Sequence, residues 1–91
     1  MTYMLCRNRV ADFATWKTVF ASHAEAHKNA GLELVKVWRD MNEPSNVFFL
    51  FEVSSVERAR EFISNREADE AGKASGVLDG EYHFLEDAGR Y

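Results

Sequence analysis

The chain has 91 residues, of which 46% are hydrophobic and 13% aromatic, and its 15 acidic and 11 basic residues give a net charge of −4. This is the length of a single domain, residues 1–91, and arginines scattered among acids exclude the basic stripe typical of a nucleic-acid-binding protein. The one cysteine cannot form an internal disulfide, and the sequence shows no signal-peptide pattern. No run approaches the roughly 18–20 apolar residues of a membrane span. We therefore expect a cytoplasmic protein with no nucleic-acid or membrane partner.

The first predicted elements are a strand over Thr2–Val10 and one long helix between Asp12 and Gly31. The Asp12 carboxylate can accept hydrogen bonds from the free amides of the first turn, and Gly31 suits the left-handed residue at which many helices stop. At about 100° per residue, one sector of roughly 80° collects the large apolar side chains together with a histidine. The residues of this sector are Phe13, Trp16, Phe20, Ala24 and His27, with His23 at its edge.

The next two predicted elements are strands over Leu32–Asp40 and Val47–Val53. Residues 41–46 between them carry proline and asparagine, which favour a turn, so the two strands are expected to form a hairpin. In the first strand, Leu34 and Trp38 are expected on one face and Val35 and Val37 on the other.

The strand Val47–Val53 is apolar on both faces, because Phe49 and Phe51 alternate with Phe48 and Leu50. A strand of this kind is normally buried on both sides. The helices of so small a domain can cover one side of its sheet. We therefore expect a second copy of the chain to cover the other side, in a homodimer.

The last part of the chain predicts another helix and a final strand. Ser54 followed by Glu57 is a capping-box pattern that opens the helix. A short helix over Glu67–Ser75, ended by Gly76, then precedes a strand over Glu81–Glu86. The expected inward residues of the first helix are Val56, Ala59, Phe62 and Ile63, and in the strand Tyr82 and Phe84 are expected opposite His83 and Leu85.

The order strand, helix, strand, strand, helix, strand predicts an α+β domain of the ferredoxin-like split βαβ type, a four-stranded antiparallel sheet with helices on one face. From Val10 to Asp87 the chain also resembles a known family. The stretches that carry the resemblance are VADFATWKTVFASHAEAHKNAGL, NEPSNVFFLFEV, VERAREFISNREADEAGKASGV and YHFLED. They are similar to the dimeric α+β barrel proteins of the antibiotic-biosynthesis-monooxygenase-like and cyclase-like group.

This resemblance implies two sheets packed face to face across a two-fold axis, and in each subunit a pocket between helices and sheet. It implies cofactor-free oxygenation, cyclisation or isomerisation of a small flat molecule, or haem degradation, since one fold hosts several chemistries. Family oxygenases carry tryptophan, asparagine and arginine around the pocket, and Trp38, Asn8 and Arg66 are candidates by residue type. The residues expected to line the pocket are Phe13, Trp16, Phe20, His23, His27, Trp38, Phe62, Tyr82 and His83.

His23 and His27 lie one helical turn apart on the same side of the helix. His23 can act as a general acid or base, because imidazole titrates near neutral pH. The pair can also bind a metal ion or haem, with His83 as a third ligand if its face looks toward the helix. As a further alternative both histidines are polar residues of a closed core, and the helix dipole would then favour a protonated His27.

Two other titratable residues carry weaker signals. Cys6 is expected to be buried and inert, because no partner base accompanies it. Glu52 is expected in solvent or paired with an arginine, with a buried acid as the alternative. We therefore predict a homodimeric protein that binds a small-molecule ligand without a tightly bound cofactor or metal, with His23 as the catalytic residue.

Overall fold

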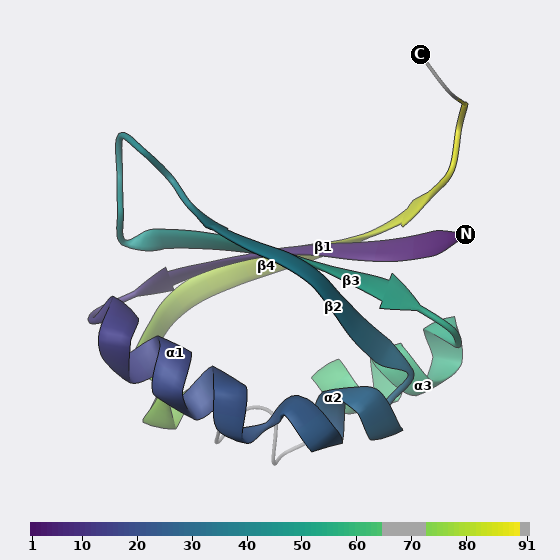
Figure 1. Cartoon of the computed structure of the whole chain (residues 1–91), viewed down its shortest axis with the longest axis horizontal. Helices are drawn as coiled ribbons and strands as arrows, with labels where there is room; N and C mark the ends of the chain where they lie inside the picture. Colours follow the sequence, from purple (N-terminus) through teal and green to yellow (C-terminus); the bar gives the residue numbers. More distant parts are fainter. Residues whose placement is uncertain (65–72, 90–91) are drawn as a thin grey trace.

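The computed structural model describes residues 1–64 and 73–89 as one four-stranded sheet with helices on one face (Figure 1). The strands run antiparallel in the order β2-β3-β1-β4. The predicted α+β class and ferredoxin-like arrangement are therefore confirmed. The elements are β1 (Thr2–Val10), α1 (Phe13–Ser22), α2 (Ala24–Asn29), β2 (Leu32–Arg39), β3 (Asn46–Val53), α3 (Val56–Ile63) and β4 (Val77–Glu86).

The helix predicted between Asp12 and Gly31 is divided in two at His23. Its start is as expected, since the Asp12 side chain accepts a hydrogen bond from the Thr15 amide at 3.0 Å. The break arises because two side chains bind the carbonyl oxygen of Val19: Nδ1 of His23 at 2.8 Å and Oγ of Ser22 at 2.6 Å. Side chains that compete in this way for a backbone carbonyl bend helices.

Strand β2 contains a bulge that reverses the predicted face of Trp38. Leu34 pairs with Phe51 and Lys36 with Leu50, so one extra residue of β2 stands between two consecutive residues of β3. An extra residue shifts the alternation of side chains by one. Leu34 consequently lies on the helix-covered face and Trp38 on the opposite face, and the prediction that they share a face is wrong.

The core lies between the helices and the inner face of the sheet. Residues of β3 alternate between buried and half-buried along its whole length. Trp16 of α1 and Ala59 of α3 are the buried contributions of their helices. The buried apolar side chains are Met4, Cys6, Val10, Trp16, Ala30, Leu32, Val47, Phe49, Phe51, Val53 and Ala59.

Two element boundaries differ from the prediction. Helix α3 is capped by Ser55, whose Oγ accepts from the Arg58 amide at 3.3 Å, and not by Ser54, whose Oγ instead donates to the Gly31 carbonyl at 3.3 Å. Strand β4 begins at Val77, four residues earlier than predicted. The helix predicted over Glu67–Ser75 and the candidate Arg66 lie mostly or wholly outside the described residues.

The outer face of the sheet carries no helix (Figure 1). By register it presents Leu5, Phe48 and Leu50 at its centre. Beside them, Arg7 donates to Glu81 at 2.8 Å and to Asp79 at 3.2 Å. Trp38 is 45% exposed and Leu85 42% exposed on this face. In residues 1–64 and 73–89, no helix is long and apolar enough to cross a membrane.

Candidate functional site

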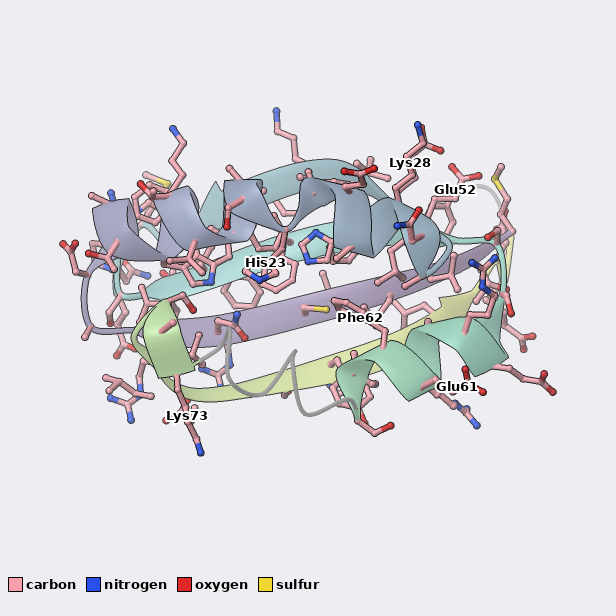
Figure 2. All side chains as sticks on the ribbon, turned by 90° about the horizontal axis from the view of Figure 1, so that it is seen from below. His23, Lys28, Glu52, Glu61, Phe62 and Lys73 are labelled. Atoms are coloured by element: carbon pink, nitrogen blue, oxygen red, sulfur yellow. The ribbon has the colours of Figure 1, made fainter. Side chains whose placement is uncertain are left out.

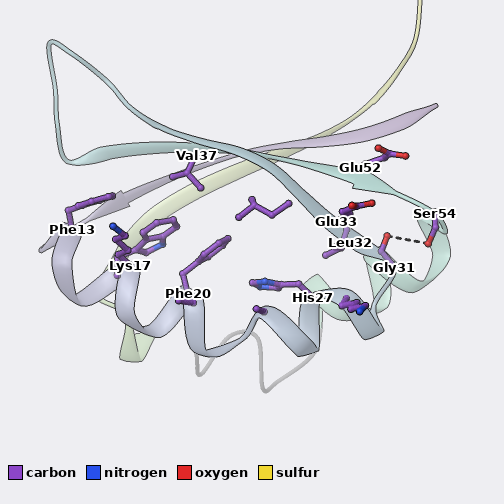
Figure 3. Close-up of a pocket in the computed structure, with 15 residues that line it drawn as sticks. Phe13, Lys17, Phe20, His27, Gly31, Leu32, Glu33, Val37, Glu52 and Ser54 are labelled. Carbon is purple, nitrogen blue, oxygen red and sulfur yellow. Dashed lines mark hydrogen bonds between the residues drawn. The ribbon is translucent and has the colours of Figure 1, made fainter.

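Two cavities lie between the helices and the sheet. The larger, of about 970 Å³, runs between α1, α2 and strand β2 and is called here the β2 cavity (Figure 3). The smaller, of about 270 Å³, lies over the middle of the sheet and is called the central cavity. Volumes of this order are typical of small-molecule sites.

The β2 cavity is lined mostly by apolar side chains. Phe13, Phe20 and His27 point into it from the helices (Figure 3). Leu32, Leu34 and Val37 line it from β2, and its charged lining residues are Lys17, Lys28, Glu33 and Glu52. Glu52 is half-buried at this end of the sheet. The ion pairs among the described residues do not include the predicted pairing of its carboxylate with an arginine.

The central cavity contains both helix histidines and a group of aromatic rings. Figure 2 shows His23 and Phe62 directed into the space between α1–α2 and α3. Its aromatic lining residues are Trp16, Phe20, Phe49, Phe51, Phe62 and Tyr82. Four residues line both cavities, namely Trp16, Phe20, His27 and Leu32, and so form the junction between them.

His27 is held in a cage of phenyl rings. Its imidazole centroid lies 4.9 Å from Phe20, 5.1 Å from Phe51 and 5.5 Å from Phe62. Burial, and secondarily the nearby charge of His23, lowers the pKa of His27 to about 4. The prediction that the helix dipole favours a protonated His27 is therefore wrong, because desolvation of the charged form outweighs the dipole.

His23 has one ring nitrogen engaged and one available. The Val19 carbonyl can only accept, so Nδ1 of His23 is the donor in the 2.8 Å bond and carries the proton. In the neutral ring Nε2 is then an acceptor, and no hydrogen bond to it is formed by the described residues. Because His23 lines the central cavity, this nitrogen can receive a proton from a molecule bound there.

A tryptophan and an asparagine meet in the central cavity. With the Asn8 amide oriented to satisfy both its groups, Asn8 Oδ1 accepts from Nε1 of Trp16 at 3.2 Å and Nδ2 donates to the Arg7 carbonyl at 3.1 Å. Opposite Asn8 on β4 stands Gly80, where a Cβ would come 2.7 Å from the amide atom of Asn8 that faces the Arg7 carbonyl, which is Nδ2 in this orientation. The tryptophan beside Asn8 is therefore Trp16, and not Trp38 as residue type suggested.

Of the nine residues expected to line the pocket, Phe13 lines the β2 cavity and six line the central cavity, which are Trp16, Phe20, His23, His27, Phe62 and Tyr82. Trp38 and His83 do not join them. Trp38 is turned away by the β2 bulge. His83 lies on the outer face, where its Nε2 contacts Glu81 at 2.8 Å.

The separation of His83 also bears on metal binding. The sheet lies between His83 and the pair His23–His27, so the predicted third ligand is on the wrong side. Within the part of the chain that the structure describes, no group of three metal-ligating side chains occurs. Cys6 is buried in the cavity wall, and burial raises the pKa of its thiol to about 12, which keeps it protonated at neutral pH.

Three lining residues were missed as site residues. Phe49 and Phe51 form the wall below the histidines, and the alternation of β3 already placed them on one face. Gly80 leaves space for the side chain of Asn8, and it lies just before Glu81, where the predicted strand begins. Pairing with β1 makes it part of a strand.

Comparison with known proteins identifies the fold. No protein-family profile matches the chain, and no curated protein is similar enough in sequence to count as a match. A Bordetella bronchiseptica structure assigned to the antibiotic biosynthesis monooxygenases matches with a TM-score of 0.78 at 14% identity, over 96% of each chain. A variant of SnoaB, a cofactor-independent oxygenase from Streptomyces nogalater, matches with a TM-score of 0.74 at 13% identity, over 98% of this chain and 94% of that one.

A third solved structure, from Caulobacter crescentus and likewise assigned to the antibiotic biosynthesis monooxygenases, matches with a TM-score of 0.73 at 17% identity, over 97% of this chain and 90% of that one. Identities this low show the fold and leave the activity to the residues of the site. The chain thus shares the fold of these antibiotic biosynthesis monooxygenase structures, the α+β arrangement of a four-stranded antiparallel sheet with helices on one face that its sequence predicted.

Proposed function

We propose that this chain binds a small, flat, mostly apolar molecule in its central cavity and transforms it without a tightly bound cofactor, by oxygenation or by cyclisation or isomerisation. The observation that carries the proposal is His23, an imidazole with a free Nε2 at the edge of an aromatic-lined cavity. The fold likeness to a cofactor-independent oxygenase supports it.

His23 would act as the proton acceptor. Its Nδ1–H is fixed by the Val19 carbonyl, which orients the ring and leaves Nε2 as the base. Transfer of a proton from an acidic hydroxyl or C–H group to Nε2 produces a substrate anion and an imidazolium. This step can begin either reaction class, because an electron-rich anion can react with molecular oxygen as the co-substrate of an oxygenation, or can attack its own carbonyl group in a ring closure.

The Trp16–Asn8 pair would position the ligand. Trp16 is only 2% exposed and stacks on Phe20 with ring centroids 4.6 Å apart, so its ring plane is fixed within the core. Asn8 fixes the indole edge through the 3.2 Å bond. Rigid aromatic walls favour a planar guest, since stacked and edge contacts both depend on ring geometry.

The test is turnover of a panel of quinols and polyketide-like phenols by wild type and by His23→Gln, with Glu25→Gln on the exposed side of α2 as the matched control. We expect His23→Gln to lower kcat by about 10²–10⁴-fold, the contribution of a general base. Glu25→Gln should retain the wild-type rate. Equal turnover by His23→Gln and wild type would remove His23 from the mechanism.

We further propose that the working unit is a homodimer joined through the outer faces of the sheets. The exposed Trp38 and Leu85 and the half-buried Phe48 and Leu50 support this, because each large apolar side chain gains about 1.5–3 kcal/mol when fully covered. Sedimentation should give a dimer at micromolar concentration, and Leu50→Lys at the centre of the face should give a monomer. A monomeric wild type at that concentration contradicts the proposal.

A further inference from the structure

His27 occupies a place that no other polar side chain shares. It is one of the four residues that line both the β2 cavity and the central cavity, and the other three are apolar or aromatic. A molecule bound in either cavity therefore lies beside its imidazole. Figure 3 shows His27 directed from α2 toward the sheet.

The ring nitrogens of His27 have no hydrogen-bond partner among residues 1–64 and 73–89. Its ring contacts Phe20 of α1, Phe51 of β3 and Phe62 of α3, and none of the described residues forms a hydrogen bond with either ring nitrogen. No polar atom of the described, unexposed side chains is both fully buried and unpaired. Each ring nitrogen of His27 therefore retains accessible surface, which a ligand can reach.

The charge state of His27 limits what it can bind. With a pKa lowered to about 4 by burial, the ring is neutral at physiological pH and offers one donor and one acceptor. A carboxylate or phosphate binds best to an imidazolium, and the phenyl cage disfavours that charge. A hydroxyl or carbonyl group matches the neutral ring and adds no charge to the cage.

Resting on the proposed function, we propose that His27 is the hydrogen-bonding residue at the junction of the two cavities and that it selects ligands bearing an uncharged hydroxyl or carbonyl group over ligands bearing a carboxylate. His23 and His27 then have different roles. His23 exchanges the proton through its free nitrogen, and His27 one turn away determines which functional group stands at the junction.

The test uses three matched probes of one ring size: 2-naphthol, 2-naphthoate and naphthalene. Their dissociation constants at pH 7 are measured by equilibrium dialysis for wild type, His27→Phe and His27→Gln. His27→Phe keeps an aromatic ring in the cage but removes both hydrogen-bonding groups, whereas His27→Gln keeps a donor and an acceptor. Circular dichroism and thermal unfolding establish that each variant is folded.

We expect wild type to bind 2-naphthol about tenfold more tightly than 2-naphthoate, which is the scale of one hydrogen bond in an apolar site. His27→Phe should lose about tenfold in affinity for 2-naphthol and leave naphthalene unchanged, and His27→Gln should recover part of the loss. Should either variant fail to fold, imidazole ¹H–¹⁵N spectra of wild type supply the readout, because 2-naphthol must shift the ring nitrogens of His27.

The outcomes separate this inference from the proposed function. If the probes bind but His27→Phe binds 2-naphthol as wild type does, or if 2-naphthoate binds wild type at least as tightly, the assignment to His27 is overturned while a ligand cavity stands. If the ring nitrogens of His27 do not move on saturation with 2-naphthol, the assignment is likewise overturned. If no probe binds wild type, both the cavity's proposed role and the assignment are wrong.

Discussion

The imidazole of His27 and the phenyl ring of Phe51 pack against each other with centroids 5.1 Å apart and planes inclined at 60°. Phe51 is only 2% exposed and belongs to the central strand pair, so this contact joins the helix layer to the middle of the sheet. A titratable ring at such a position links the stability of the fold to pH.

Stability should fall as the pH is lowered from about 6.5 to about 4, because His27 titrates differently in the two states. Its pKa is near 6.5 in the unfolded chain and about 4 in the folded one, so in this window the unfolded state binds the extra proton. The full shift corresponds to ~3 kcal/mol, and partial solvent access to the half-buried ring reduces our expectation to about 1–2 kcal/mol.

The measurement is the free energy of unfolding in urea at pH 7 and at pH 4.5, for wild type and for His27→Phe. The carboxylates are the same in both proteins, so their contribution cancels in the comparison. The wild type should lose more stability than His27→Phe between the two pH values. Parallel losses in the two proteins would show that the ring of His27 is not desolvated.

Gly80→Ala should destabilise the domain, because β4 approaches β1 too closely at this point for a side chain. The added Cβ would lie 2.7 Å from the side-chain amide nitrogen of Asn8, in the orientation that satisfies both its groups, and 2.8 Å from the carbonyl oxygen of Arg7. Overpacking of this kind costs about 1–3 kcal/mol. The loss is measured as a shift in the urea midpoint at constant m-value.

A double-mutant cycle identifies the clash. Asn8→Ala removes one of the two close contacts, so Gly80→Ala should cost less in an Asn8→Ala background than in wild type. The remaining cost reports the Arg7 carbonyl, which no side-chain change can relieve. If Gly80→Ala lowers the free energy of unfolding by the same amount in both backgrounds, the side chain of Asn8 does not lie beside Gly80 in the position from which it contacts Trp16.

The cap of helix α3 distinguishes two adjacent serines. Ser55→Ala should cost about 1 kcal/mol, the usual value of an N-cap, because Ser55 Oγ accepts from the Arg58 amide. Ser54→Ala is the matched control and should cost less, since Ser54 is exposed and its hydroxyl only donates to the Gly31 carbonyl. A larger loss for Ser54→Ala in urea denaturation would restore the capping box predicted from sequence.

Local patterns predicted the architecture because they report burial directly. The alternation of Phe49 and Phe51 with Phe48 and Leu50 predicted a strand with two apolar faces. In the structure the face of Phe49 and Phe51 is buried under the helices and the face of Phe48 and Leu50 is half-buried. Asp12 and Gly31 marked the two ends of the helical segment, where a hydrogen-bonded cap and a φ of 76° are found. Such signals are short-range, so a sequence can display them.

The predictions that were wrong concern features that depend on tertiary contacts, and the periodicity of a sequence does not encode these contacts. The break at His23 depends on two side chains binding one carbonyl, that of Val19. The face of Trp38 depends on how β2 pairs with β3, and one unpaired residue reverses it. The neutral state of His27 depends on rings from three separate elements. Each is a consequence of tertiary packing, and each changes the composition of the candidate site.

The two tryptophans test two statements together, that Trp38 lies on the outer face of the sheet and that this face forms the dimer contact. Trp16 is 2% exposed, whereas Trp38 is 45% exposed on the outer face of the subunit. In the variant Trp38→Phe, the remaining Trp16 should resist quenching by acrylamide at every protein concentration. In Trp16→Phe, the remaining Trp38 should be quenched readily at nanomolar concentration and become protected at micromolar concentration, because a second sheet then covers it.

Leu50→Lys in the Trp16→Phe background separates the position of Trp38 from the position of the dimer contact. If the outer face is the dimer contact, this variant stays monomeric and Trp38 remains accessible to acrylamide at all concentrations. If Trp38 is shielded even in that monomer, it lies beneath the helices on the inner face of the sheet, and the bulge in β2 is wrong. If Trp38 stays accessible in the micromolar dimer of the parent variant, the bulge stands and the subunits meet elsewhere, since a buried indole cannot be reached by the quencher.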